Sequence, residues 1–318
     1  MRAIRRVAWI FLAGLAVLGA TAASSQNYPS KTIRIVTAQP GGGTDFVARL
    51  IAQGLSGALG QAVIVENRPA IIQGEIVSKA PPDGYTLYVA GESLWVQSLL
   101  QKVPYDPVRD FTPITLVTNS PNILAVHPSL PVRSVKELIA LARARPGELN
   151  YGSSGVGASA HLAAELFRGM TGVNIVHVPY KGTADLSISL MSGHVQLAFI
   201  TITAMAPLIK TGKLRALAIT SVKPSALVPA LPTVAETVPG YVSGGEVAVF
   251  APPGTPAAIV SRLNPIVVQF VNTAATKERL FSAGFEVFGS TPDELAAWVK
   301  AEMARWSKVI KDAGIRGQ

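Results

Sequence analysis

Two glycine-rich segments hold the residues of this sequence that are best suited to binding a small anion. The first reads QPGGGTD and lies between a β-branched run and a stretch with helical apolar spacing. The N-terminus of a helix leaves backbone N–H groups unpaired and carries a partial positive charge, and glycine allows close approach to them. We therefore predict a binding loop that includes Gln39, Gly42, Gly43, Thr44 and Asp45. Thr44 is a candidate N-cap, and Asp45 either complements the helix dipole or repels an anion. The alternative to a binding loop is a tight turn that holds no ligand.

The second segment, YGSSGVGASAHLAAELF, has the same strand–loop–helix context. Residues 155–160 match the dinucleotide pattern G-x-G-x-x-A, but the region where a ribose-binding acid belongs, VNIVHVPY, has no Asp or Glu. Serine hydroxyls suit a small carboxylate at least as well as a pyrophosphate, so this loop is the second half of the predicted site. Its candidate ligand-binding residues are Ser153, Ser154, Gly157, Ala158 and Ser159. Together the two loops predict a clamp for an anionic ligand, and Ser93 is a further candidate wall residue.

Catalysis is a weaker interpretation of the same residues. Ser153 does not lie in a G-x-S-x-G elbow, and a triad of Ser153, His161 and Asp185 is a combination that any chain of this size offers. The four histidines are at least sixteen residues apart, which is not the spacing of a metal site. We therefore expect no catalytic residue, no metal and no cofactor.

The N-terminus has the features of a secretory signal. Three arginines precede the apolar stretch Val7 to Ala20, and Ala20-Thr21-Ala22 is a small-residue cleavage pattern, so we expect a signal peptide at 1–22, cleaved near Ala22. The apolar stretch is too short for an ordinary membrane span, although an uncleaved anchor is the alternative. The sequence has no cysteine, which favours a bacterial periplasm over an animal extracellular space.

The charge distribution argues against nucleic acid as a partner. The formal net charge is +9, and removal of the three signal arginines leaves 25 basic minus 19 acidic residues, or +6. This excess is dispersed rather than gathered in a basic patch with aromatic partners. A weak positive field that attracts small anions, or ordinary surface charge, is the interpretation that remains.

Strands alternate with helices in two successive blocks, which predicts an α/β protein with two lobes, each a mostly parallel sheet flanked by helices. Predicted strands lie at 32–38, 62–66, 122–126, 149–153, 174–178, 195–200, 213–220 and 246–251, with one more after the Asp83-Gly84 turn. Predicted helices lie at 44–59, 134–145 and from the second loop to 170, and the C-terminal third is mostly helical.

The ordered motifs of the chain resemble those of the tripartite tricarboxylate transporter substrate-binding proteins, also called Bug receptors. The similarity runs from Tyr28 nearly to the end and includes YPSKTIRIV, PGGGTD, ENRP, APPDGYTL, VPYDPVRDFTPITLV, LNYGSSGVGASAHLAAELF, VHVPYKG, GKLRALAIT, LPTVAE and APPGTP. The resemblance implies a periplasmic binding protein of type II that closes on a small carboxylate and delivers it to membrane permease subunits. It also implies lobe 1 at 27–122 with 246–318 and lobe 2 at 123–245, and we expect a monomer.

Two departures from the family pattern concern the ligand. Ala70-Ile71-Ile72-Gln73 stands where a glycine loop is usual, which predicts an altered wall of the cleft. Gln196 and Ile200 stand near a position that is often Asp, which favours a simple carboxylate over an amino acid. A sensor or partner-binding protein with a degenerate pocket and an exported α/β hydrolase remain the alternative functions.

Overall fold

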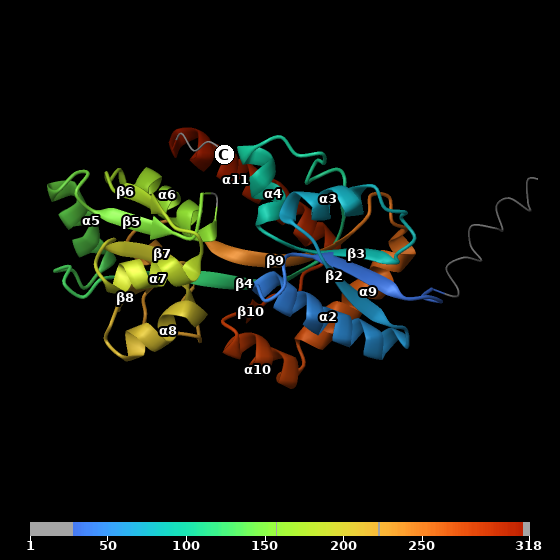
Figure 1. The fold of residues 1–318 in the computed structure, drawn as a ribbon. Coiled ribbons are helices and arrows are strands. Elements are labelled where there is room, and N and C mark those ends of the chain that lie inside the picture. The colour runs from blue at the N-terminus through green and yellow to red at the C-terminus, as the bar shows by residue number, and fades with distance from the viewer. Residues whose placement is uncertain (1–27, 157, 222, 314–318) are drawn as a thin grey trace, which may run out of the picture.

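The computed structural model describes residues 28–156, 158–221 and 223–313, and its strands form one curled sheet with helices packed around it (Figure 1). The expected signal peptide at 1–22 lies outside the described residues. Along the sheet the strands follow the order β2-β1-β3-β9-β4-β7-β5-β6, and β8 and β10 pair with β4 off this path. The mixed α/β architecture predicted from the alternation of strands and helices is confirmed.

The first half of the sheet begins with three parallel strands, β1 (Ile33–Thr37), β2 (Val63–Asn67) and β3 (Thr86–Gly91). Their connecting helices are α2 (Gly43–Leu59) and α3 (Ala70–Ser78), and α4 (Ser93–Leu100) follows β3. The apolar periodicity of α2 is used as predicted, since Val47, Leu50, Ile51 and Leu55 are buried. Helix α2 begins two residues earlier than the Thr44 cap predicted, because Gly42 is the N-cap.

The segment Ala70 to Gln73 is a correction to the sequence analysis. It was expected to be an apolar loop in the cleft wall, but it forms the first turn of α3. Gln73 is buried and its Nε2 donates a hydrogen bond to the Arg68 carbonyl (2.6 Å), while Ile72 is 45% exposed. The residues that replace the usual glycines therefore continue a helix, for which isoleucine and glutamine have better propensity than glycine.

Two long strands join the halves. β4 (Thr112–Val126) pairs with β9 (Gly244–Ala251) through its first part and with β7 (Leu197–Thr201) and β8 (Arg215–Ile219) through its last five residues. Figure 1 shows β4 and β9 side by side where one half passes into the other. After β9 the chain continues through α9 (Ala257–Val271), α10 (Ala274–Ser282) and the short β10 (Glu286–Val287).

The second half repeats the strand–helix alternation. Its remaining strands are β5 (Asn150–Ser153) and β6 (Val176–Pro179), which are parallel to each other. Its helices are α5 (Val135–Ala144), α6 (Ser159–Thr171), α7 (Thr183–Met191) and α8 (Ile202–Lys210), and a single 3-10 turn, η1 (Val234–Glu236), precedes β9. Ser134 caps α5, accepting a hydrogen bond from the Glu137 N–H.

The C-terminal helix α11 (Pro292–Ala313) packs against α4, β4 and α6, and so contacts both halves (Figure 1). One apolar stripe of α11 is buried, with Leu295, Val299, Trp306 and Ile310 in one core cluster. Alternation along β9 separates two cores: Ala248 and Phe250 belong to the α11 core, whereas Val247 and Val249 belong to the core under α2 and α9. No helix among the described residues is long and apolar enough to cross a membrane.

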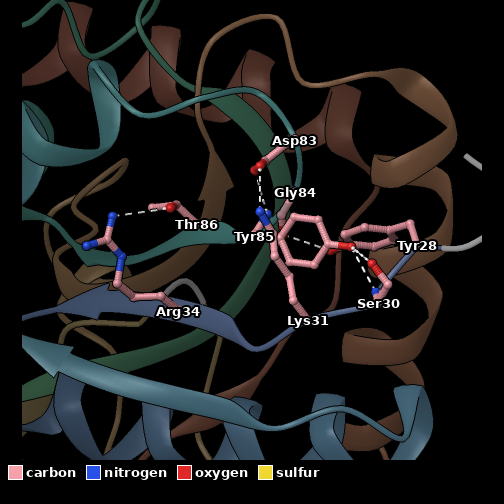
Figure 2. A network of polar contacts seen from close by, with 8 residues as sticks. All are labelled: Tyr28, Ser30, Lys31, Arg34, Asp83, Gly84, Tyr85 and Thr86. Carbon is pink, nitrogen blue, oxygen red and sulfur yellow. Dashed lines mark hydrogen bonds and ion pairs between the residues drawn. The ribbon is translucent and has the colours of Figure 1, made fainter. Parts of the chain in front are cut away.

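Contacts around Tyr28 fasten the start of the described chain to the turn before β3 (Figure 2). The Tyr28 hydroxyl donates to the Gly84 carbonyl (2.8 Å), and the Ser30 N–H donates to the Tyr85 hydroxyl (2.8 Å). Gly84 adopts a φ of 80°, and a Cβ there would lie 2.7 Å from the Tyr28 ring. The Asp83-Gly84 turn predicted from sequence is thus confirmed, and glycine is required at its second position.

Candidate ligand-binding site

A cleft of about 290 Å3 lies between the two halves of the sheet. The first half contributes residues at the starts of α2 and α4, the second half contributes residues at the starts of α6 and α8, and the joining strands supply the floor. The lining residues are Gly43, Thr44, Gly91, Glu92, Ser93, Ser120, Ala158, Ser159, Thr201, Gly245, Glu246, Val247 and Phe285. The two glycine-rich loops predicted from sequence therefore do face one cavity.

Four helices begin at this cleft, and none of the four has its first amides capped by a side chain. The N-caps of α2, α4, α6 and α8 are Gly42, Glu92, Ala158 and Thr201, each without a side-chain cap hydrogen bond. Elsewhere in the described chain, Ser134 and Thr273 cap α5 and α10, whereas α3, α7 and α9 also lack a side-chain cap. The convergence of four uncapped starts is therefore what distinguishes the cleft. Helix N-termini with free N–H groups attract anions, and here two of them come from each half.

The electrostatic attraction of the cleft comes from backbone and not from basic side chains. Among the described lining residues there is no Lys, Arg or His. Hydroxyl groups stand at all four helix starts, on Thr44, Ser93, Ser159 and Thr201, and Thr201 occupies the N-cap position of α8 without a side-chain cap hydrogen bond. Hydroxyls and amide N–H groups donate hydrogen bonds in fixed directions. The arrangement can bind the oxygens of a carboxylate.

Asp45 holds the first loop in place from behind the cleft. Its carboxylate is 4% exposed and accepts hydrogen bonds from the Gly41 N–H (3.0 Å), Asn67 Nδ2 (2.7 Å) and Arg49 Nε (3.1 Å). Burial alone would raise the pKa of Asp45, but these hydrogen bonds and the Arg49 charge lower it below its usual value. The carboxylate is thus an internal brace of the loop, with its oxygens directed at protein donors.

The second loop is braced in a comparable way. Ser153 is fully buried, and its Oγ lies 2.7 Å from His177 Nε2 and donates to the Gly155 carbonyl (3.0 Å). The His177 ring stacks on the His161 ring at a centroid distance of 4.1 Å. Burial, His177 and Arg168 lower the pKa of His161 to about 4, so its ring is neutral near pH 7.

Asn122 connects the second loop to the joining strand β4. Its Nδ2 donates to Ser159 Oγ (3.0 Å), which leaves the Ser159 hydroxyl proton available to a ligand. Asn122 itself is 1% exposed, and its N–H donates to Thr220 Oγ1 (2.8 Å). The orientation of a cleft hydroxyl is therefore fixed by the strand that joins the two halves.

Two glutamates that the sequence analysis did not single out lie at the floor of the cleft. The antiparallel register of β3 and β9 ends with Gly91 paired to Val247, and Glu92 follows β3 close enough to Glu246 for the two carboxyl groups to influence each other. The Glu246 side chain lies on the same strand face as Ala248, toward the α11 core. Both carboxyl groups are more than nine-tenths buried, and Glu92 Oε1 and Glu246 Oε2 have no hydrogen-bond partner among the described residues.

The burial of these glutamates determines their charge. Desolvation, the charge of Glu246 and that of Glu302 raise the pKa of Glu92 well above its usual value. Desolvation and Glu302 raise the pKa of Glu246 to about 8, although Arg305 acts in the opposite direction. Protonated glutamates do not repel an anion, so the acidic residues of the floor leave the positive field of the helix starts intact near pH 7.

The predicted site residues fall into two groups. Gly43, Thr44, Ser93, Ala158 and Ser159 line the cleft, whereas Gln39, Gly42, Asp45, Ser153 and Ser154 are outside its lining, and Gly157 lies outside the described residues. Ile71 and Ile72, which could have filled a degenerate pocket, are not among the lining residues either. Thr201 was missed, although it ends a strand before a helix as the glycine loops do. Phe285 carries no such local signal.

Comparison with known proteins places this geometry in a family of solute receptors. The model of the tripartite tricarboxylate transporter family receptors, TctC, matches residues 47–315. Protein BugT of Bordetella pertussis is 35% identical over 324 residues, covering 99% of this chain and 99% of BugT. The chain belongs to the tripartite tricarboxylate transporter receptor family.

Two similar solved structures contain a carboxylate. Rpa4515 of R. palustris with adipate is 41% identical, with a TM-score of 0.77, and the match covers 92% of this chain and 100% of that one. MatC of Rhodopseudomonas palustris with bound malate is 30% identical, with a TM-score of 0.73 and coverage of 89% and 100%. The periplasmic binding protein BugD is 31% identical, with a TM-score of 0.73 and coverage of 92% and 100%.

Proposed function

We propose that this protein is a periplasmic receptor that captures a small organic carboxylate between two lobes and delivers it to the membrane subunits of a tripartite tricarboxylate transporter. The observation that carries the proposal is the meeting of four uncapped helix N-termini at one cleft. Family membership and the adipate and malate bound by similar proteins support the same ligand class. Export with cleavage near Ala22 and a monomeric state are parts of this proposal.

The proposed lobes are 27–122 with 246–318 and 123–245. This division is supported by the pairing of β4, whose residues up to Pro121 pair with β9 and whose residues from Asn122 pair with β7. A ligand that contacts helix starts from both lobes binds the closed arrangement more tightly than the open one. The closed receptor is then the form that a permease recognises.

Binding without turnover is also proposed, because the residues that might form a hydrolase triad are not arranged as one. Ser153 is fully buried and contacts His177, whereas Asp185 is exposed on α7. A nucleophile must reach its substrate and be activated by an oriented base. The hydroxyls that do face the cleft stand at helix starts, where they suit the holding of an anion.

Differential scanning fluorimetry of the purified mature protein tests the proposed function. Adipate and malate are compared with adipamide, which has the length of adipate but carries no charge. We expect at least one carboxylate to raise Tm and adipamide to have no effect, because helix N-termini favour a negative charge. NMR of the ligand after incubation is expected to show the compound unchanged.

Two outcomes would contradict this proposal. A broad carboxylate panel without any Tm shift would favour the alternative of a partner-binding protein with a degenerate pocket. Conversion of the added compound would favour an exported hydrolase. Mass spectrometry of small molecules that copurify with the protein would identify the natural ligand directly.

A further inference from the structure

We propose that Asn122 is a positioning residue of the binding site: it makes the Ser159 hydroxyl a hydrogen-bond donor to the ligand, so that the ligand must present an acceptor, such as a carboxylate oxygen, at the start of α6. The inference rests on the proposed function and concerns a residue that does not itself line the cleft. It follows from the place of Asn122 in the sheet and from the hydrogen bonds that it makes.

Asn122 stands at the point where β4 changes its pairing partner. The preceding residue, Pro121, is paired with Gly244 of β9, whereas Asn122 is paired with Thr201 of β7. Thr201 is the N-cap of α8, Ser159 is the first residue of α6, and both line the cleft. Asn122 therefore adjoins both of the helix starts that the second half contributes to the cleft.

The main chain of Asn122 is held by Thr220, which is fully buried. The Asn122 N–H donates to Thr220 Oγ1 (2.8 Å), and the Thr220 N–H donates to the Asn122 carbonyl (2.9 Å). Thr220 Oγ1 also donates to the carbonyl of Ser243, which directly precedes β9, and the Ser243 N–H donates to the Thr220 carbonyl (3.1 Å). Because these bonds join the two chain segments that connect the proposed lobes, the backbone that carries the Asn122 side chain is fixed.

The Asn122 side chain determines which way the Ser159 hydroxyl is used. Asn122 Nδ2 donates to Ser159 Oγ (3.0 Å), so the oxygen already serves as an acceptor within the protein, and its proton is left for a ligand. A carboxylate oxygen receives that proton in a charge-assisted hydrogen bond, which is stronger than one between neutral groups. An ammonium or amide N–H group at this position would instead face a second donor, Asn122 Nδ2, across the same oxygen.

A double-mutant cycle on the full mature protein tests this inference. Calorimetry measures the affinity for adipate, or for malate where adipate does not bind, in the wild type, Asn122→Leu, Ser159→Ala and the double variant. We expect Ser159→Ala to weaken binding by roughly tenfold and Asn122→Leu by about fivefold, which correspond to the loss of a charged and of a neutral hydrogen bond. Because Asn122 acts through the Ser159 hydroxyl, the double variant should bind within about twofold of Ser159→Ala.

Asn264→Leu is the matched control, because Asn264 Nδ2 donates to the carbonyls of Ile114 (2.7 Å) and Ser290 (2.8 Å), which do not line the cleft. It should keep the wild-type affinity. Circular dichroism checks that each variant folds, and Asn122→Ala takes the place of Asn122→Leu if the leucine variant does not. Additive losses of affinity at positions 122 and 159, or no loss in Ser159→Ala, would overturn the inference while leaving the proposed function intact. Failure of the wild type to bind any acid would overturn both.

Discussion

At the scale of single residues, the three consecutive glycines of the first loop have three different roles. Gly41 adopts a φ of 83°, which residues with a Cβ rarely adopt. Gly42 is the N-cap of α2, and a Cβ there would meet nothing closer than the Gln39 carbonyl oxygen at 3.8 Å. Gly43 makes room for the Phe285 ring. The run of glycines is therefore not one uniform cradle for a ligand.

This difference predicts unequal effects of adding one methyl group. Gly43→Ala must displace the Phe285 ring from the start of α2, so we expect carboxylate affinity to fall by at least tenfold. Gly42→Ala has space for its Cβ, so we expect its affinity to stay within about threefold of wild type. Its free energy of unfolding should fall somewhat, because alanine is a poorer N-cap residue than glycine. Calorimetry with the tightest-binding acid measures the affinity of both variants. Equal losses of affinity would show that displacement of the Phe285 ring is not the cause of the weaker binding.

At the scale of the element, the start of α2 is positioned by a side chain that does not line the cleft. Asp45 bonds to the Gly41 N–H, and Asn67, which also donates to the Ala38 carbonyl, links the loop to the end of β2. The sequence analysis left open whether Asp45 complements the helix dipole or repels the ligand. The structure gives it a positioning role, with its charge neutralised locally by Arg49.

Asp45→Asn is expected to weaken this brace without altering the cleft lining. The variant loses charge-assisted hydrogen bonds of a buried carboxylate, so we expect a loss of about 1.5–3 kcal/mol in the free energy of unfolding and a several-fold weaker carboxylate affinity. Urea unfolding and calorimetry measure the two effects. Asp312→Asn, which removes an exposed carboxylate paired with Lys308 at the far end of α11, is the control and should change neither.

At the scale of the whole molecule, a buried acidic cluster lies where β3, β9 and α11 meet. Glu92 and Glu246 face the ion pair of Glu302 and Arg305, and Arg305 also donates to the Val242 carbonyl. Like charges opposite each other on adjacent strands destabilise a sheet, so the fold keeps these groups protonated near neutral pH. The cluster therefore links the stability of the joined halves to pH.

The sign of that linkage follows from the pKa of Glu246, which rises from an ordinary 4.5 to about 8 on folding. Between these values the unfolded chain is ionised and the folded protein is not, so stability falls as pH rises through this window. We expect Glu246→Gln to have a larger free energy of unfolding than wild type at pH 8. This difference should shrink on the order of 1 kcal/mol per pH unit as the pH is lowered toward 5. Urea unfolding at several pH values across this range measures how the free energy of unfolding changes with pH.

Glu278→Gln, on the exposed face of α10, is the control for the urea experiment. It should leave the pH dependence of the free energy of unfolding unchanged. A wild-type stability that rises between pH 5 and pH 8 through the same window would contradict the assignment of Glu246 as protonated. Glu246→Gln lies on β9 and changes none of the helix starts at the cleft, so ligand affinity near pH 7 provides a check that the site is intact.

The class of fold and the two glycine-rich loops that face the cleft could be predicted from the sequence, because both depend on local patterns. Apolar periodicity distinguishes strands from helices, and glycines before a helix mark an exposed N-terminus. Gly43, Thr44, Ala158 and Ser159, which line the cleft, were identified in this way, and Ser93 was a further candidate wall residue without such a pattern. Thr201 was within reach of the same rule, since it too ends a strand and begins a helix.

Only the tertiary structure decided which of the candidates face the cleft and what else lines it. Gly42 and Gly43 are neighbours in the same motif, yet a side chain at Gly42 would meet no other side chain, whereas Gly43 is covered by the ring of Phe285. Phe285 lies 242 residues further along the chain than Gly43. Glu92 and Glu246 lie near each other because β3, which ends just before Glu92, pairs with β9, and no local pattern encodes that pairing. Long-range packing sets these features, because the position and charge of a side chain depend on every segment that folds around it.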